Sequence, residues 1–207
     1  MITIAIAKGY LYNEAVNLFE KLGYHFPDND ERQLYVDEAQ GRLRLLRIRP
    51  WDVTVYVSQG AADLGVVGKD VLLEKPEEPV IQLLDLKFGN CSLVLAGPNP
   101  MNADQLTHNL HVATKYPHCT EAYFRKRGLS VNLIKLYGAV ELGPHTGLSD
   151  LICDLTATGR TLKENHLHII DTVFSSTAHL VANPVSFKTE HKAILELVAR
   201  LSTVVPA

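Results

Sequence analysis

The chain has 207 residues, of which 46% are apolar and 21% charged, and a formal net charge of −3. This composition is typical of a globular protein with one large domain or two smaller lobes. The slight excess of acid excludes a general nucleic-acid binder, which needs a strongly basic face. No apolar stretch approaches the ~20 residues that a membrane-spanning helix requires.

The beginning of the chain and its cysteines indicate a compartment. Ile2–Ala7 reads as a strand and carries neither a basic segment nor a cleavage signal. Cys91, Cys119 and Cys153 are odd in number and widely spaced, which favours neither a disulfide framework nor a zinc cluster. The cytoplasm is therefore the expected location.

Strand-like and helix-like segments alternate along the chain. In the first half, the pattern predicts strands over 2–7, 42–48 and 62–67 and helices over 11–22 and 53–58. Gly23 and Gly60 end these helices, and Asp52 caps the second. The second half predicts strands over 91–96, 110–114 and 131–136 and helices over 120–126 and at the end of the chain.

This alternation predicts an α/β protein with parallel sheets. Two lobes are expected, lobe I from residues 1–88 plus 178–207 and lobe II from residues 89–177. Ligands of open α/β sheets bind beyond the carboxyl ends of the strands. The loops that follow four of the strands are therefore expected to line one cleft: those at Lys8, Lys69, Lys115 and Thr158.

The segment 151–165 is the most informative stretch. An apolar run leads to Asp154, and a turn of small residues then leads through Gly159 to Thr161 and a helix-compatible tail. Backbone N–H groups and hydroxyls at a helix N-terminus favour a phosphate, and the upstream carboxylate can accept hydrogen bonds from a sugar. Phosphate plus ribose is the predicted ligand. An ordinary strand-to-helix turn with Thr161 as its N-cap explains the same residues.

Cationic residues supply a second set of candidates. Lys8-Gly9 follows the first strand directly, where glycine lets a backbone approach an anion, although a plain turn is the alternative. Two arginines close the strand 42–48, where planar guanidinium groups match phosphate oxygens. The cationic candidates are Lys8, Arg32, Arg47, Arg49 and Lys115.

Several familiar motifs are missing. Gly68-Lys69-Asp70 is not a Walker A motif, because Asp63 stands where its first glycine belongs and Asp70 replaces its hydroxyl. None of the nine histidines belongs to a catalytic triad or a metal cage. The chemistry is therefore expected to depend on positioning and charge stabilisation rather than on covalent catalysis.

Six segments, in order, resemble the ATP phosphoribosyltransferase family, which catalyses the first step of histidine biosynthesis. They are IAIAKGY, RPWDVTVYVSQGAADLGVVGKDVL, DLKFGNCSLVLA, VATKYPHCTEAYF, IKLYGAVELGPHTGLSDLICDLTATGRTLKEN and SSTAHLVAN. The resemblance covers nearly the whole chain. It implies a two-lobed fold like that of the type II periplasmic binding proteins, with the active site in the interlobe cleft.

The resemblance also implies partners. Only about one helix is expected after Asn183, which leaves no room for the regulatory domain of the long form of the enzyme. Short forms depend on a regulatory subunit similar to histidyl-tRNA synthetase. A homodimer within a hetero-octamer is therefore expected.

Site residues follow from the resemblance by position. Phosphoribosyl pyrophosphate (PRPP) would be held by Glu141 and by the loop 154–161, namely Asp154, Ala157, Thr158, Gly159, Arg160 and Thr161. ATP would be held by Gly9, Arg49, Asp70, Lys115 and Tyr116, and the catalytic residues would be Lys8, Arg32 and Arg49. No residue is expected to ligate a metal, because Mg²⁺ is expected to arrive with PRPP. The chain departs from the family at Tyr10, where arginine is common, and at Cys153, where phosphoribosyltransferase loops usually carry a second acid.

The reaction that the resemblance implies is attack of adenine N1 of ATP on C1 of PRPP, with release of pyrophosphate. Adenine N1 bears a lone pair, so no strong base is needed, which fits the missing triad. The alternative is a non-catalytic two-lobed binding or sensor module, which the segment GAADLGVVG alone would suit. A phosphoribosyltransferase for another base also fits the loop taken alone.

Overall fold

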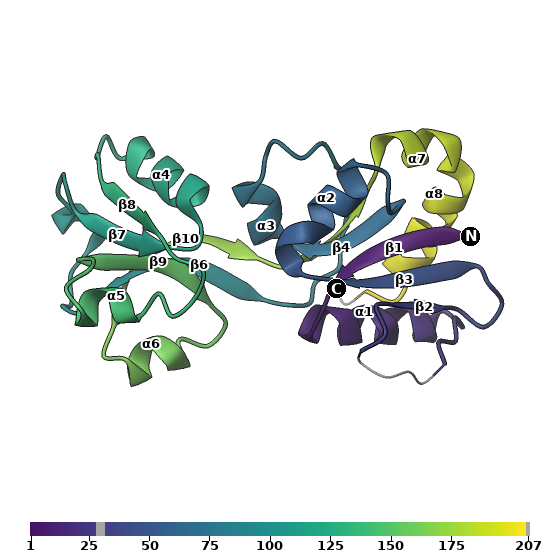
Figure 1. The fold of residues 1–207 in the computed structure, drawn as a ribbon, viewed down its shortest axis with the longest axis horizontal. Helices are drawn as coiled ribbons and strands as arrows, with labels where there is room; N and C mark the ends of the chain where they lie inside the picture. The colour runs from purple at the N-terminus through teal and green to yellow at the C-terminus, as the bar shows by residue number, and fades with distance from the viewer. Residues whose placement is uncertain (28–31, 206–207) are drawn as a thin grey trace. The chain divides into compact units, whose positions relative to one another are not determined.

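The computed structural model describes residues 1–27 and 32–205. The chain forms two units (Figure 1): unit 1 comprises Met1–Gly89 and Thr177–Ala207, and unit 2 comprises Asn90–Ser176. The chain therefore passes between the units twice, after Gly89 and after Ser176. In the described part of the chain, no helix combines the length and apolarity needed to cross a bilayer.

Unit 1 is built on a six-stranded sheet. In spatial order its strands are β2 (Tyr35–Asp37), β3 (Leu43–Ile48), β1 (Ile2–Ala7), β4 (Leu64–Gly68), β11 (Ala178–Ala182) and β5 (Ile81–Asp85). The strand β1 lies parallel to β3 and β4, whereas β2 pairs antiparallel with β3 and β11 pairs antiparallel with β4 and β5.

Helices cover both faces of this sheet. The helices of unit 1 are α1 (Tyr10–Lys21), α2 (Val53–Ser58), α3 (Lys69–Glu74), α7 (Pro184–Thr189) and α8 (His191–Ser202), with a 3₁₀ turn η1 at Pro50–Asp52. Successive side chains of β1 point to opposite faces. Ile4 and Ile6 pack with apolar residues of α1 and α8. Ala5 and Ala7 pack with those of α2 and α3 on the other face.

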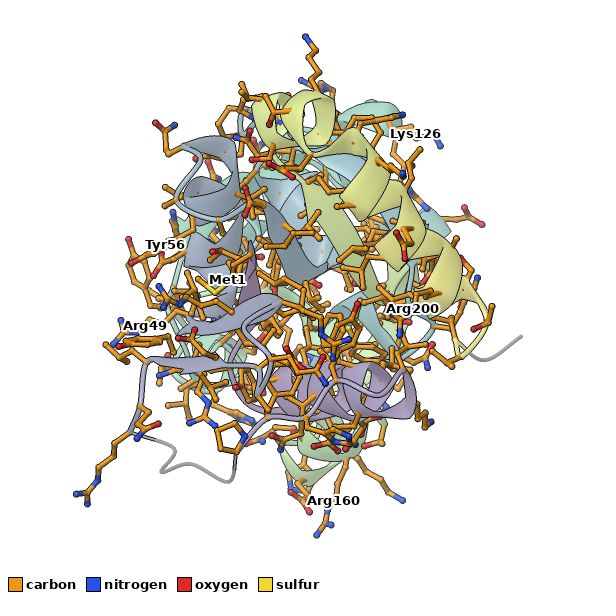
Figure 2. The ribbon with its side chains drawn as sticks, turned by 90° about the vertical axis from the view of Figure 1, so that its right-hand side faces the viewer. Met1, Arg49, Tyr56, Lys126, Arg160 and Arg200 are labelled. Carbon is orange, nitrogen blue, oxygen red and sulfur yellow. The ribbon has the colours of Figure 1, made fainter. Side chains whose placement is uncertain are left out.

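The C-terminal helix α8 contacts the C-terminal end of α1. Arg200 of α8 donates a hydrogen bond from Nη2 to the carbonyl oxygen of Leu22 and another, of 2.8 Å, from Nη1 to the hydroxyl of Tyr24. Its guanidinium carbon also lies 4.9 Å from the centroid of the Tyr24 ring. Figure 2 shows Arg200 between the two helices. A cation thus satisfies a carbonyl at the negative end of the α1 dipole.

Unit 2 contains a five-stranded sheet. In spatial order its strands are β10 (His168–Ser176), β6 (Cys91–Gly97), β9 (Leu151–Thr156), β7 (His111–Thr114) and β8 (Asn132–Lys135). Its helices are α4 (Pro117–Lys126), α5 (Leu142–His145) and α6 (Arg160–Glu164), with a 3₁₀ turn η2 at Ala103–Gln105. Figure 1 shows α4 on one face of the sheet and α5 and α6 on the other.

The α/β class is confirmed, but both sheets are mixed and not parallel throughout as the alternation predicted. In unit 2, β6 lies antiparallel to both β9 and β10, and in unit 1, β11 runs against its two neighbours. Among the strands that the structure describes, β7, β8 and β9 in unit 2 and β1, β3 and β4 in unit 1 pair in parallel. A buried apolar run has the same composition in either direction, so the pattern could not distinguish the two.

Two predicted helix caps are also wrong. Asp52 has helical backbone angles (φ −101°, ψ −14°) and makes no side-chain cap, because the 3₁₀ turn begins earlier, at Pro50. Thr161 is not the N-cap of α6, because Gly159 is, with φ 72°. The C-terminal segment is longer than the single helix expected, since both α7 and α8 follow Asn183.

Candidate active site

The sequence-predicted residues of unit 1 meet at one edge of its sheet. Lys8 follows β1, Arg49 follows β3 and Lys69 follows β4, and these three strands are parallel neighbours. The N–H of Lys8 donates a 2.8 Å hydrogen bond to the carbonyl oxygen of Ile48, which fixes the first two loops side by side. We call this place the carboxyl edge of unit 1.

Gly9 shapes the N-terminus of α1 at this edge. Its φ of 92° and ψ of −140° belong to a region that essentially only glycine occupies. Its carbonyl oxygen accepts the N–H groups of Tyr12 at 3.1 Å and Asn13 at 3.3 Å. The N–H groups of Gly9, Tyr10 and Leu11 have no hydrogen-bond acceptor among residues 1–27 and 32–205. With Lys8 exposed beside them, these donors suit an anion.

The two arginines at the end of β3 differ. Arg47 lies with its guanidinium carbon 4.5 Å from the centroid of the Tyr12 ring and donates from Nη1 to the carbonyl oxygen of Gln33 at 3.4 Å. Arg49 is exposed, and its side chain forms no hydrogen bond or ion pair with any residue that the structure describes. Figure 2 shows it at the surface. Arg47 therefore stabilises the fold, while Arg49 is available to a ligand.

Arg32 belongs to the same edge. The strand β2 pairs antiparallel with β3, so the residues that enter β2 lie where β3 ends. The N–H of Arg47 donates to the carbonyl oxygen of Leu34 at 2.8 Å, which anchors this segment two residues after Arg32. Arg32 is exposed and, like Arg49, a cation at the carboxyl edge of unit 1.

Asp70 is placed differently from the cations. It is the second residue of α3 and only 7% exposed. A Cβ built on Gly68 would lie 2.1 Å from Asp70 Oδ1, so the carboxylate folds back over that glycine. Because only a hydrogen atom fits between them, Gly68 is required for the position of this carboxylate.

A second set of candidates meets at the corresponding edge of unit 2. The strands β9, β7 and β8 are parallel neighbours, and the loop 157–159 and Lys115 follow the first two. Thr114, the last residue of β7, donates from Oγ1 to the carbonyl oxygen of Cys153 at 2.6 Å and accepts the N–H of Tyr116 at 2.8 Å. The loops after both strands therefore start from one fixed point.

The loop after β9 exposes backbone donors. The N–H of Gly159 donates to Thr156 Oγ1 at 2.8 Å, and that of Arg160 lies 3.4 Å from Thr158 Oγ1. The N–H groups of Ala157, Thr158 and Thr161 find no acceptor in the described part of the chain. The sequence analysis missed Thr156, although its spacing of three residues from Gly159 is typical of a hydroxyl-closed turn.

The helix that follows this loop is short. The helix α6 has five residues, so the open N–H groups and the hydroxyls, rather than a long helix dipole, would hold a phosphate. The exposed Arg160 forms an ion pair with Glu164, with its Nε 2.8 Å from Oε1. Figure 2 shows its side chain projecting outward, so the backbone of Arg160, more than its charge, belongs to the loop.

Asp154 has a perturbed carboxyl group. Its pKa is raised to about 6, mainly by burial and in smaller part by the neighbouring Glu141, while the Leu155 N–H, 2.9 Å from Oδ1, and Lys115 lower it. These charges come from β9, from the start of α5 and from the loop after β7. The structure thus brings three of the predicted residues of unit 2 within electrostatic reach of one another.

Tyr116 lies in the same unit but is buried, with only 4% of its surface exposed. Its carbonyl oxygen accepts the hydroxyl of Thr120 at 2.6 Å. In this conformation its ring is not available to stack on a base, whereas the neighbouring Lys115 is only half-buried. The five residues predicted for ATP are therefore divided, with Gly9, Arg49 and Asp70 in unit 1 and Lys115 and Tyr116 in unit 2.

The carboxyl edge of unit 1 carries cations and backbone N–H groups without acceptors, and unit 2 carries a hydroxyl-lined loop and two carboxylates. These features define a two-lobed binding fold suited to phosphorylated ligands. Solved solute-binding proteins share this fold. The substrate-binding protein of an amino acid ABC transporter is 14% identical, with a TM-score of 0.60 over 97% of this chain and 90% of that chain. The alkanesulfonate-binding protein from Xanthomonas axonopodis pv. citri is 11% identical, with a TM-score of 0.59 over 98% and 72%. At such identities the likeness concerns the fold alone.

Closer relatives identify the family. The family model described as ATP phosphoribosyltransferase matches residues 49–203. An ATP phosphoribosyltransferase from Geobacillus sp. (strain WCH70) is 43% identical over 208 residues, covering 100% of each chain. One from Gloeothece citriformis (strain PCC 7424) is 47% identical over 194 residues, covering 91% of this chain and 90% of that protein. The solved ATP phosphoribosyl transferase (HisG:HisZ) complex from Thermotoga maritima has a chain 36% identical, with a TM-score of 0.83 over 99% and 98%.

The chain belongs to the ATP phosphoribosyltransferase family. This confirms the family and the two-lobed fold type expected from the sequence. The roles of individual residues stay predictions.

Proposed function

We propose that this chain transfers the phosphoribosyl group of PRPP to N1 of ATP, giving N1-(5-phosphoribosyl)-ATP and pyrophosphate, in the cytoplasm. The observation that carries the proposal is the match to ATP phosphoribosyltransferases along the whole chain, at 43% identity. This reaction is the first step of histidine biosynthesis. It is tested by incubating the chain with ATP, PRPP and Mg²⁺ and measuring both products.

Unit 2 holds PRPP in this proposal. The open N–H groups of Ala157, Thr158 and Thr161 and the hydroxyls of the loop donate to the 5-phosphate. Asp154 and Glu141 accept hydrogen bonds from the ribose hydroxyls, which relieves the repulsion between the two carboxylates. A phosphate and a sugar diol together define a phosphoribosyl group, which supports this placement over a simple anion site.

The same carboxylates fit the metal that PRPP carries. Mg²⁺ is commonly bound through one or two carboxylates together with substrate phosphates, so an ion that arrives with PRPP would find such oxygens on Asp154 and Glu141 without a dedicated protein site. When bound, the ion neutralises charge on the pyrophosphate that departs. No larger carboxylate cage is required, in keeping with a metal that arrives with its substrate.

Unit 1 supplies cations for the nucleotide and the leaving group. Arg49 and Arg32 are exposed at the carboxyl edge of unit 1, and Lys8 stands beside the open N–H groups that begin α1. Their role is to stabilise negative charge that grows on the pyrophosphate as the bond to C1 breaks. Adenine N1 attacks with its own lone pair, so the protein needs to orient the two substrates rather than remove a proton.

The loop assignment has a direct test. Thr161→Ala should raise the dissociation constant of PRPP, measured by calorimetry, because it removes a hydroxyl beside the phosphate. Thr189→Ala is the matched control, since Thr189 is an exposed helix residue of unit 1. An unchanged affinity in Thr161→Ala would place the phosphate elsewhere.

We also propose that the chain works with a second, regulatory subunit. The solved relative from Thermotoga maritima is a HisG:HisZ complex, which supports a partner for this chain. The family resemblance implies that this partner is similar to histidyl-tRNA synthetase. A homodimer within a hetero-octamer is the assembly expected. Light scattering of the chain with and without a co-expressed partner tests the assembly, and turnover measured on the same samples tests whether the partner changes activity.

A further inference from the structure

The two connections between the units leave unit 1 side by side. Residues 86–89 form the first connection, and Thr177 and Ala178 form the end of the second. The N–H of Leu86 donates to the carbonyl oxygen of Ala178, and the N–H of Ala178 donates to that of Phe88, both at 2.8 Å. Whatever fixes one connection therefore fixes the other.

A single carboxylate joins both connections. Asp85, the last residue of β5, accepts the N–H of Lys87 at 3.0 Å and the hydroxyl of Thr177 at 2.8 Å on the same oxygen, Oδ1. Its other oxygen, Oδ2, forms an ion pair with Lys87 Nζ at 3.0 Å. Asp85 is thus bonded to the first connection through the backbone and to the second through a side chain.

The backbone that Asp85 holds is unusual. Lys87 has a φ of 61°, in the left-handed region that L-residues other than Asn and Asp rarely enter. Such a conformation persists only where surrounding contacts impose it, and the bonds from Asp85 to its N–H and its ammonium group do so here. Without them, residue 87 would relax and the path of the first connection would change.

The second connection extends this link to the proposed active site. The carbonyl oxygen of Thr177 accepts the N–H of Lys69 at 2.9 Å. Lys69 is the first residue of α3 and lies at the carboxyl edge of unit 1, next to Asp70. A continuous set of hydrogen bonds therefore leads from residue 87 through Asp85 and Thr177 to the edge where the predicted ATP residues lie.

The carboxylate stays ionised at every working pH. Burial raises the pKa of Asp85, but the bonds from the Lys87 N–H, the Thr177 hydroxyl and Lys87 Nζ, with the charge of His179, bring it down to about 2. Lys69 and Lys87 are the other cations near His179. The link is therefore constant and not a pH switch.

We propose that Asp85 is a positioning residue for phosphoribosyl transfer: it fixes both connections where they leave unit 1 and, through Thr177, the start of α3 at the carboxyl edge of that unit. This inference rests on the proposed function, in which residues at the carboxyl edge of unit 1 serve phosphoribosyl transfer. Asp85 contacts neither substrate, so its loss should reduce turnover without weakening the binding of either substrate alone.

The test compares Asp85→Ala with Asp85→Asn and Thr177→Val. Asp85→Ala should lower kcat by about 10-fold to 100-fold, the size expected when reacting groups shift by about 1 Å. The dissociation constants of ATP and of PRPP, each measured alone by calorimetry, should stay within about twofold, a change near 0.4 kcal/mol. Asp85→Asn retains an oxygen for both hydrogen bonds and should restore most of kcat, and Thr177→Val, which removes one bond, should lie between them.

Asp37→Ala is the matched control, because Asp37 forms a surface ion pair with Arg44 in the same unit at 2.6 Å. Hydrogen exchange at residues 86–88 and 177–178 should rise in Asp85→Ala and not in the control. Unchanged kcat, or a parallel loss of substrate binding and kcat, would overturn the inference. If Asp85→Ala does not fold, Thr177→Val decides by the same criteria. A wild-type chain that makes no phosphoribosyl-ATP either alone or with its co-expressed partner refutes the proposed function, whereas the hydrogen-exchange measurement tests the link through Asp85 independently of activity.

Discussion

Thr114 donates a hydrogen bond of 2.6 Å from its Oγ1 to the carbonyl oxygen of Cys153. This bond joins the ends of β7 and β9, the two strands from which Lys115 and the loop 157–159 depart. The same oxygen accepts the N–H of Tyr116 at 2.8 Å, and Thr114 is completely buried. One hydroxyl therefore sets the starting positions of both segments that we assign to the substrates in unit 2.

Replacing this hydroxyl with a methyl group should destabilise the protein. Thr114→Val has nearly the same shape but removes the hydroxyl that bonds to two buried backbone groups, at a cost of about 1–3 kcal/mol. Urea unfolding followed by circular dichroism measures the loss, and Thr114→Ser should recover most of it. Thr189→Val, on the exposed face of α7, should stay within about 0.5 kcal/mol of the wild type. Equal midpoints for the two valine variants would contradict this account.

The elements that the sequence predicts well are those whose burial repeats with a simple period. The helix α8 buries Ile194, Leu197 and Leu201, as their spacing predicts, because one side of a helix returns every three or four residues. By contrast, β10 was not predicted. Its pairing with β6 shifts register twice, between Ile169 and Asp171 and between Thr172 and Phe174, which breaks the alternation that would reveal a strand.

Within the candidate site, too, some features could be predicted from a local sequence pattern and others could not. The turn at Gly159 could be predicted from the sequence, because its positive φ lies in the left-handed backbone region that favours glycine. The bond between Thr114 and Cys153 joins segments 39 residues apart. No local pattern records such a contact, so it could not be predicted before the strands were paired.

Arg49 should matter for turnover and not for stability. Its exposed side chain forms no hydrogen bond or ion pair with the residues that the structure describes, so Arg49→Ala should leave the free energy of unfolding within about 0.5 kcal/mol. Loss of one preorganised donor at a developing charge should lower kcat by about 10²–10³. Steady-state kinetics and urea unfolding of the same sample separate the two effects.

Two further variants sharpen this test. Arg49→Lys keeps the charge but loses the planar fork, and should recover only part of the rate. Arg125→Ala removes an exposed arginine at the end of α4 and should leave kcat unchanged. Near-normal kcat in an Arg32→Ala, Arg49→Ala double variant would refute the catalytic assignment of both arginines.

Gly68→Ala should displace the carboxylate of Asp70. Gly68 has ordinary extended angles, φ −67° and ψ 144°, so the backbone accepts alanine. The new Cβ would lie 2.1 Å from Asp70 Oδ1, which must move. If Asp70 contacts ATP, the KM for ATP should rise by at least about tenfold, near 1.4 kcal/mol. Gly138→Ala, at a glycine with open space around it, is the control, and equal KM values would exclude Asp70 from the ATP site.

The ionised carboxylate of Asp154 should lower the free energy of unfolding and, at the same time, strengthen the binding of PRPP. Burial and Glu141 raise its pKa from 3.8 to about 6, so the folded chain binds this proton more tightly than the unfolded chain does. The resulting stabilisation is complete below pH 3.8 and is lost as the pH rises through about 6, after which the ionised group costs up to about 3 kcal/mol. The cost is smaller to the extent that water screens this partly exposed side chain.

Asp154→Asn should therefore unfold at a higher urea concentration than the wild type at pH 8, with little difference at pH 4. It should also lose affinity for PRPP, because an amide accepts the ribose hydroxyls less strongly than a carboxylate does. Asp37→Asn should have the opposite effect and unfold at a lower urea concentration than the wild type at pH 8. The hydrogen bonds from Arg44 lower the pKa of Asp37, so its charge stabilises the fold. If Asp154→Asn were less stable than the wild type at pH 8, the carboxylate would be a structural group, and its assignment to the ribose would have to be withdrawn.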